Sequence, residues 1–200
     1  MKKNIIFMMD VDLKGSTHES LKHRYSDSRR APYKFSINSW KKWASKNNAE
    51  LFILNEVLMP NKDMGICWQR YYLFDILEAN NINYDQIAMV DADTIIHPDC
   101  PNFFKLTNNK FTGVHCDASY DWVGTDQTPV NILVEKENIE LKLLPYEFNM
   151  VDMPRKELLN ENLTFSDVGW IYQFNCIPNN KDNKATYYWM EKTYKHLYEN

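Results

Sequence analysis

The chain has 200 residues, a formal net charge of −4, 44% hydrophobic residues and 14% aromatic residues. This length and apolar content are sufficient for one folded domain spanning residues 1–200. The negative charge, without a basic stripe interleaved with aromatic residues, argues against a protein that binds nucleic acid. No apolar run is long enough for a signal sequence or a membrane span, so we expect a soluble, cytoplasmic protein.

The cysteines also restrict the class of protein. Cys67, Cys100, Cys116 and Cys176 are widely separated and form no C-x-x-C pair. Their spacing excludes zinc-ribbon and thioredoxin-like sites, and we expect reduced thiols that are mostly buried.

The first part of the chain alternates a predicted strand, a helix and a second strand. Residues 5–9 are an apolar run bounded by charge, which is typical of a buried strand. A helix is predicted over residues 36–46, because the spacing of Trp40 and Trp43 places both on one face. A short strand is predicted over residues 51–54. This alternation is typical of an α/β fold.

The clearest helical pattern covers residues 64–79. Cys67, Tyr71, Phe74 and Leu77 recur at helical spacing and form a predicted apolar stripe. The pair of asparagines that follows ends the pattern.

The next strand carries the strongest functional signal. An apolar run, residues 87–90, leads directly into Asp91 and Asp93, and the chain becomes apolar again at residues 95–96. Acids at the carboxyl end of a buried strand lie where open α/β sheets bind their ligands. Two like charges this close repel each other unless a cation lies between them. Because oxygen ligands suit Mg²⁺ or Mn²⁺ better than zinc, we predict that Asp91 and Asp93 bind one of these ions.

The second half of the chain has a mixed order of elements. Strands are predicted over residues 111–115, 139–143 and 169–177, and helices over residues 126–134 and 185–198. Polar, irregular stretches are predicted at residues 14–30, 117–124 and 150–167. The whole pattern predicts an α/β protein with a nucleotide-binding first half.

Three motifs, in the order in which they occur, resemble those of the GT-A glycosyltransferases. The likeness is closest to the retaining group that includes glycogenin and the bacterial lipopolysaccharide galactosyltransferases. The motifs are the D-x-D sequence Val90-Asp91-Ala92-Asp93-Thr94, the D-Q-x-x-x-N helix at residues 126–131 with the L-P-x-x-x-N turn at residues 144–149, and the late strand at residues 169–175.

The resemblance implies an α/β GT-A fold, in which helices flank a mixed central sheet. It also implies the transfer of a sugar, most simply a hexose, from a nucleotide-sugar donor to a glycan, lipid or protein acceptor, with retention of configuration. By the same resemblance, Asp91, Asp93 and Gln173 bind Mn²⁺ or Mg²⁺, and Asp91 also contacts the ribose. Arg70 faces the donor phosphates, and Asp10 lies where the family recognises the nucleobase.

The resemblance also gives roles to two residues of the D-Q motif. Asp126 would bind sugar hydroxyls, and Gln127 would lie near the anomeric carbon. The chain departs from the family at two places. Gln173 stands where the family usually has a histidine ligand, and residues 120–124 do not match the family's strand with an Asn-Gly pair.

Each candidate also has a purely structural interpretation, which the sequence leaves open. These interpretations are a strand-end turn for Asp91 and Asp93, an N-cap for Asp126, a hydrogen bond to Asn131 for Gln127, a solvated helix charge for Arg70, a paired strand amide for Gln173 and a loop position for Asp10.

Two rival functions stay open as well. A phosphohydrolase of the haloacid-dehalogenase type has a strand followed by D-x-D, which residues 10–12 and 91–93 approach. Lys14 and Ile95, each two residues beyond the second acid, fit that motif poorly. A non-catalytic protein that only binds sugar nucleotides is the other alternative, because Gln173 replaces the expected histidine.

Overall fold

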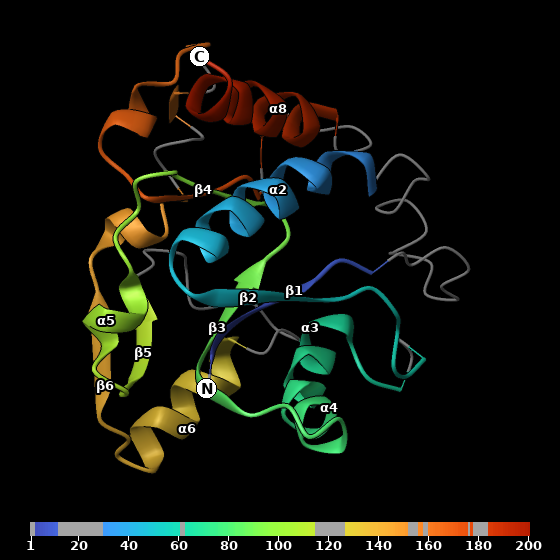
Figure 1. Cartoon of the computed structure of the whole chain (residues 1–200). Coiled ribbons are helices and arrows are strands. Elements are labelled where there is room, and N and C mark those ends of the chain that lie inside the picture. The colour runs from blue at the N-terminus through green and yellow to red at the C-terminus, as the bar shows by residue number, and fades with distance from the viewer. Residues whose placement is uncertain are drawn as a thin grey trace.

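Parallel strands with helices on both faces form the centre of the molecule (Figure 1). The computed structural model describes residues 3–11, 30–60, 63–114, 127–151, 156–157, 160–175, 177 and 184–200, with the backbone alone at residues 30–32, 66, 127 and 128. The strands are β1 (Lys3–Met9), β2 (Ala49–Leu54), β3 (Tyr84–Asp91), β4 (Thr94–Ile96), β5 (Phe111–Val114), β6 (Leu141–Leu144) and β7 (Ile171–Gln173). The helices are α2 (Arg30–Lys46), α3 (Ile66–Gln69), α4 (Leu73–Ala79), α5 (Phe103–Thr107), α6 (Gln127–Lys136) and α8 (Lys184–Tyr198), with the 3₁₀ helices η2 (Arg70–Tyr72), η3 (Tyr146–Phe148) and η4 (Thr164–Asp167).

Strand β1 is the central strand of a three-stranded parallel sheet. It pairs with β2 on one side and with β3 on the other. Met9 at the end of β1 lies opposite Leu54 and Asp91, which are the last residues of β2 and β3. All three strands therefore end at one edge of the sheet, and this is the edge at which parallel α/β sheets bind ligands.

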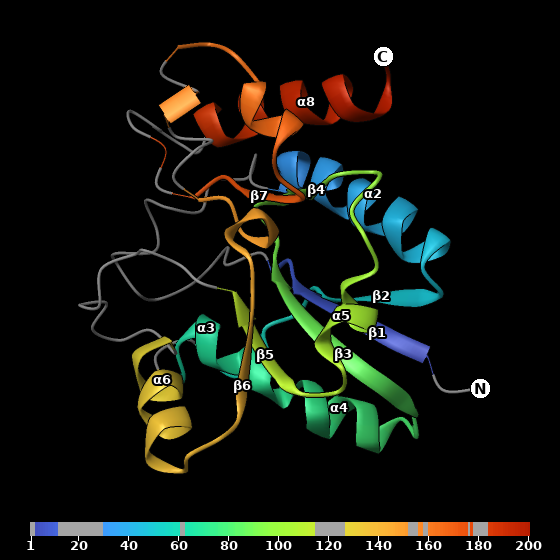
Figure 2. The same cartoon turned by 90° about the vertical axis from the view of Figure 1, so that its left-hand side faces the viewer.

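Alternate residues of β1 face two different helices, because successive side chains of a strand point to opposite faces of the sheet. Ile6 and Met8 belong to one hydrophobic cluster with the two buried indoles of α2. Ile5 and Phe7 belong to another cluster with two buried leucines of α4. Figures 1 and 2 show α2 and α4 on opposite faces of the sheet. Burial on both faces explains why β1 is a continuous apolar run instead of an alternating one.

A third layer lies beyond α2. Helix α8 packs along α2, and a third hydrophobic cluster joins α8 to β4 and β7 (Figure 2). Strands β4 and β7 are antiparallel, with Thr94 opposite Gln173. Strands β5 and β6 form a separate parallel pair. The predicted α/β architecture with flanking helices is confirmed. The central sheet itself is parallel, and the antiparallel pair β4–β7 belongs to a separate sheet.

Most predicted elements occur with their ends shifted by a few residues. The strand predictions in the first half and the helices predicted over residues 36–46, 126–134 and 185–198 are confirmed by β1, β2, β3, α2, α6 and α8. Cys100 is buried, as predicted, and Cys67 is half-buried. The described residues do not include Cys116, Cys176, residues 117–124 or residues 14–29 of the irregular stretch predicted over residues 14–30. The last residue of that stretch, Arg30, is the first residue of α2. None of the helices in the described part of the chain has the length and apolar character needed to cross a membrane.

The continuous helix predicted over residues 64–79 is wrong. The structure has α3, then the 3₁₀ turn η2, then α4. A 3₁₀ turn has fewer residues per turn than an α-helix, so it rotates the face that follows it. Leu73 is therefore fully buried, whereas Phe74, part of the predicted apolar stripe, is 47% exposed. Leu77 is buried as predicted.

The strand predicted over residues 169–177 is also too long, because only Ile171–Gln173 pair with β4. The adjacent stretch that was predicted to be polar and irregular contains η4, in which Phe165 is fully buried. Tyr172 explains both differences. Its hydroxyl oxygen lies 3.2 Å from the Ser166 carbonyl oxygen and 2.5 Å from that of Gly169, and its single proton is shared between these two acceptors. This contact holds the preceding segment against the short strand.

Gly169→Ala should destabilise the protein. A Cβ at Gly169 would lie 1.7 Å from Met150 Sδ and 2.9 Å from Tyr172 Cε1, and both side chains are almost completely buried. Overpacking of this kind costs about 1–3 kcal/mol of unfolding free energy, which urea titration measures. Gly113→Ala is the matched control, since its Cβ would make ordinary contacts at 3.6 Å and 3.8 Å. Equal losses in the two variants would contradict the packing seen at Gly169.

His97, directly after β4, should make stability depend on pH. Burial lowers the pKa of His97 below the ordinary value of 6.5, against the opposing effect of Asp99. Its Nδ1 accepts a hydrogen bond from the Asp99 amide at 3.0 Å, which requires the unprotonated ring nitrogen. Because the unfolded chain binds the proton more readily, the contribution of His97 is present above its unfolded pKa. It is lost as the pH falls through the folded pKa.

We therefore expect His97→Gln to reduce the fall in unfolding free energy between about pH 7 and about pH 5, measured by urea titration at several pH values. His196→Gln, at an exposed position, is a second comparison; because the charge of His196 helps to lower the pKa of His97, this variant should reduce the fall less than His97→Gln does. The same pH dependence in wild type and His97→Gln would show that His97 is not responsible.

Candidate active site

The connection between β3 and β4 lies at the ligand-binding edge of the sheet. Strand β3 ends at Asp91, β4 begins at Thr94, and we name residues 91–94 the acidic turn. The Thr94 hydroxyl donates a hydrogen bond to the Asp91 carbonyl at 2.6 Å. The Phe174 amide donates to the Asp93 carbonyl at 2.9 Å. A hydrogen bond therefore fixes the backbone carbonyl of each acid.

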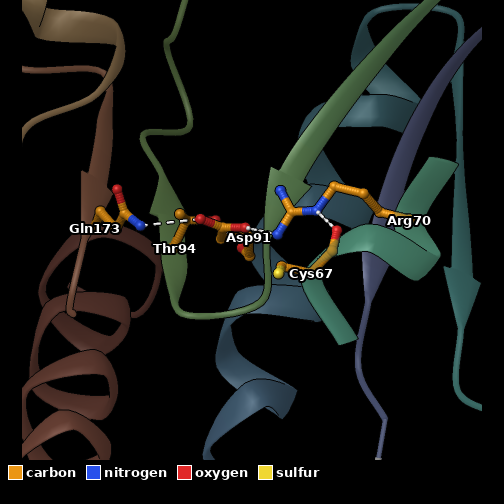
Figure 3. Close-up of polar contacts among 5 residues, drawn as sticks. All are labelled: Cys67, Arg70, Asp91, Thr94 and Gln173. Carbon is orange, nitrogen blue, oxygen red and sulfur yellow. Dashed lines mark hydrogen bonds and ion pairs between the residues drawn. The ribbon is translucent and has the colours of Figure 1, made fainter. Parts of the chain in front are cut away.

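The carboxylate of Asp91 has a different partner at each oxygen (Figure 3). Oδ1 accepts a hydrogen bond from Arg70 Nη2 at 3.2 Å, and Oδ2 accepts one from Gln173 Nε2 at 3.0 Å. These residues come from η2, β3 and β7. The structure thus brings together Arg70, Asp91 and Gln173, three of the side chains to which the resemblance gave roles at the phosphates, the ribose and the metal.

Arg70 is oriented by the short helices that precede β3. Its Nε donates to the Cys67 carbonyl at 3.1 Å, while Nη2 reaches Asp91 (Figure 3). The side chains of Arg70 and Asp91 are 28% and 41% exposed, so solvent and ligands can reach the pair. Arg70 is therefore more than a solvated helix charge, because its guanidinium is directed at the sheet edge.

The residue before Arg70 is a structural anchor that the sequence analysis missed. Gln69 is fully buried, and its Nε2 donates to the carbonyls of Met59 and Met64. Its Oε1 accepts hydrogen bonds from the amides of Leu58 and Met59. The side chain thereby uses all of its hydrogen-bonding positions. Gln69 fixes the loop that follows β2 and, next to it, Arg70. In the sequence, Gln69 is one of several polar residues within residues 64–79, so nothing distinguished it.

Gln173 approaches the acidic turn from the strand that pairs with β4. It is 9% exposed, and its amide group faces the Asp91 carboxylate. Rotation of the amide by half a turn would present Oε1 in place of Nε2 at the same point. The side chain can therefore act either as a donor to Asp91 or as an oxygen ligand beside it, so both interpretations of Gln173 stay open.

The acidic turn has the donor atoms that a hard divalent cation needs. Asp91 and Asp93 have carboxylate oxygens and Gln173 has an amide oxygen, the ligand types that Mg²⁺ and Mn²⁺ prefer. The described residues contain no group of three or more His, Cys, Asp or Glu side chains that could hold a metal ion. A cation at the acidic turn would therefore need a further ligand, such as Gln173 or the phosphates of a substrate.

A small pocket lies beside Asp91 at the sheet edge. It has a volume of about 40 Å³ and is lined by Phe7, Met9, Arg70, Met89, Val90 and Asp91. This volume is enough for water molecules or one small ion, whereas pockets for drug-sized ligands occupy roughly 300–1,000 Å³. The pocket can accept only one part of a nucleotide sugar, and its charged wall consists of Arg70 and Asp91.

The other predicted site residues are placed as follows. Asp10 lies at the same edge as Asp91, and its amide donates to the Leu54 carbonyl at 2.9 Å. Gln127 is the first residue of α6, with only its backbone described, and Asp126 lies outside the described residues. Their assigned roles therefore remain predictions.

Comparison with known proteins identifies the fold. No family model and no curated protein matches the chain. The structure is similar to that of a glycosyltransferase involved in the glycosylation of the major capsid of PBCV-1, with a TM-score of 0.60 and 8% sequence identity over 92% of this chain and 98% of that one. A second solved structure, that of a protein from Desulfovibrio desulfuricans G20 assigned as a nucleotide-diphospho-sugar transferase, is 12% identical over 100% of this chain and 98% of that one. Its TM-score of 0.44 is too low to indicate a shared fold. The chain therefore has a GT-A-like α/β fold.

Arg70→Gln should leave the stability almost unchanged. Because its ion pair with Asp91 is partly exposed, we expect the free energy of unfolding to fall by less than about 1 kcal/mol in a urea titration. A loss of about 3 kcal/mol or more, typical of a broken buried pair, would show that Arg70 serves the structure and not a ligand.

Proposed function

We propose that this chain is a metal-dependent glycosyltransferase that uses a nucleotide-sugar donor. The observation that carries the proposal is the contact of Asp91 with Arg70 and Gln173 at the carboxyl edge of the parallel sheet. A nucleoside diphosphate with its cation needs carboxylates for the cation and a guanidinium for the phosphates, and these groups are neighbours here. The GT-A-like fold supports the same class of substrate.

The diphosphate of the donor is the leaving group, and it gains negative charge as its bond to the sugar breaks. A bound Mn²⁺ or Mg²⁺ supplies Lewis-acid stabilisation of that charge. Asp91, Asp93 and Gln173 are the proposed ligands. Arg70 is 3.2 Å from Asp91 and can exchange this contact for phosphate oxygens, which a guanidinium binds in a bidentate manner.

We further propose that the transferred sugar is a hexose, that its configuration is retained, and that the acceptor is a glycan, lipid or protein. The support is the motif order described above, in which Asp126 holds sugar hydroxyls and Gln127 lies near the anomeric carbon. An amide is a poor nucleophile, so displacement on the face of the leaving group is simpler than a covalent intermediate. Such a site works mainly by positioning and electrostatics. Asp10 would contact the nucleobase.

A protein that binds sugar nucleotides without catalysis is the second candidate. Gln173 favours it, because an amide binds Mn²⁺ more weakly than an imidazole does. Hydrolysis of the bound sugar nucleotide in the presence of Mn²⁺ would exclude this candidate. A phosphohydrolase has less support, since no third acidic side chain joins Asp91 and Asp93 among the described residues. Turnover of a generic phosphate ester with Mg²⁺ would favour it.

Asp93→Ala should abolish the Mn²⁺-dependent binding of a nucleotide sugar and leave the fold intact. A panel of nucleotide sugars, screened by thermal shift with and without Mn²⁺, first identifies the donor that binds. Calorimetry then measures its affinity. Removing a residue that only orients a metal ligand lowers metal affinity by up to roughly 100-fold. Because Asp93 is itself a proposed ligand, the affinity for the donor with Mn²⁺ should fall by more than this.

Two variants serve as controls for this measurement. Asp85→Ala removes an exposed acid at the other end of β3, and it should bind the donor as wild type does. Gln173→His should strengthen Mn²⁺ binding, because an imidazole nitrogen replaces an amide oxygen. Unchanged binding by Asp93→Ala, with a circular dichroism spectrum like that of wild type, would contradict the assignment of the metal site.

A further inference from the structure

A buried chain of two hydrogen bonds connects the acidic turn to helix α2. The indole Nε1 of Trp40 donates to Thr94 Oγ1 at 2.9 Å, and this hydroxyl donates to the Asp91 carbonyl at 2.6 Å. Trp40 is 0% exposed and Thr94 is 4% exposed. Neither residue lines the pocket beside Asp91. Both side chains therefore approach the acidic turn from its buried side and not from the pocket.

Chemistry fixes the direction of both bonds. An indole N–H can only donate, so the oxygen of Thr94 must accept from Trp40. The single hydroxyl proton is then directed to the Asp91 carbonyl. In a buried site, a hydroxyl that donates and accepts at the same time strengthens both bonds. Valine has nearly the same shape as threonine but can make neither bond.

Thr94 also links the acidic turn to the strand that carries the third proposed ligand. It is the register partner of Gln173 in the β4–β7 ladder, and Figure 3 shows it beside the contact between Gln173 and Asp91. The next residue along β7, Phe174, donates its amide to the Asp93 carbonyl at 2.9 Å. A displacement of Thr94 would therefore move all three proposed ligands relative to one another.

We propose that Trp40 and Thr94 are positioning residues, whose hydrogen bonds fix the acidic turn in the geometry that binds a divalent cation. This inference rests on the proposed function and assigns part of the site's geometry to helix α2. Partners that orient metal ligands typically affect metal affinity by roughly 10- to 100-fold when they are removed.

Trp43 offers a matched control on the same helix. Its indole is also fully buried, and it donates a hydrogen bond of 2.8 Å to the Cys100 carbonyl, beyond β4 and away from the acidic turn. Trp43→Phe removes the same kind of bond and a similar amount of core packing as Trp40→Phe. Only Trp40→Phe breaks the connection to Thr94.

Amide hydrogen exchange, followed by NMR, tests the positioning without any ligand. We expect the Phe174 amide to exchange about fivefold faster or more in Thr94→Val and Trp40→Phe than in wild type. In Thr94→Ser, which keeps the hydroxyl, and in Trp43→Phe the rate should stay close to that of wild type. Equal rates in wild type and Thr94→Val would overturn the proposal. Thr94→Val, which keeps the core filled, decides the result if Trp40→Phe does not fold.

Calorimetric titration with Mn²⁺ alone tests the consequence for the site. We expect the affinity to fall by about 10-fold or more in Thr94→Val and Trp40→Phe and to be kept in Thr94→Ser and Trp43→Phe. Wild-type affinity in Thr94→Val, despite faster exchange, would overturn the role of these residues in metal binding. If wild type binds Mn²⁺ neither alone nor together with a nucleoside diphosphate, the proposed function fails, and the exchange rates still decide whether Trp40 and Thr94 fix the turn.

Discussion

The candidate site depends on one carboxylate at the end of one strand. The parallel register of β1 and β3 brings Asp91 to the edge of the sheet, beside the end of the central strand. The carbonyl of Asp91 is then held by Thr94, and its two carboxylate oxygens are held by Arg70 and Gln173. Each partner comes from a different element. The orientation of the Asp91 side chain therefore depends on how these elements pack against one another.

Charge explains why a cation and a diphosphate would bind at this edge together. Asp91 and Asp93 carry two negative charges and Arg70 carries one positive charge, so the three side chains have a net charge of −1. A divalent cation changes this value to +1, which attracts the phosphates of a nucleotide. Without the cation, the acids repel phosphate, and Asp91 competes with it for the guanidinium. In the proposed function, each ligand would therefore improve the site for the other.

The sequence predicted the position of the acidic turn because an apolar run that ends in two acids has few stable places in an α/β fold. It did not predict the break between α3 and α4, which accompanies the contacts of Gln69 with a distant loop. The spacing of the two indoles predicted that Trp40 and Trp43 share one face of a helix. It could not predict that the N–H of Trp40 meets Thr94, which is 54 residues away along the chain. The roles of Asp126 and Gln127 depend on motif order alone, because their side chains lie outside the described residues.

The most direct test of the proposed site is the position of manganese in a crystal of the wild-type protein. Crystals grown with MnCl₂ and a nucleoside diphosphate would be measured at the manganese absorption edge. We predict an anomalous peak at the acidic turn, bonded to carboxylate oxygens of Asp91 or Asp93 and to the diphosphate. A well-ordered nucleotide with manganese elsewhere, or with no manganese at the turn, would contradict the assignment.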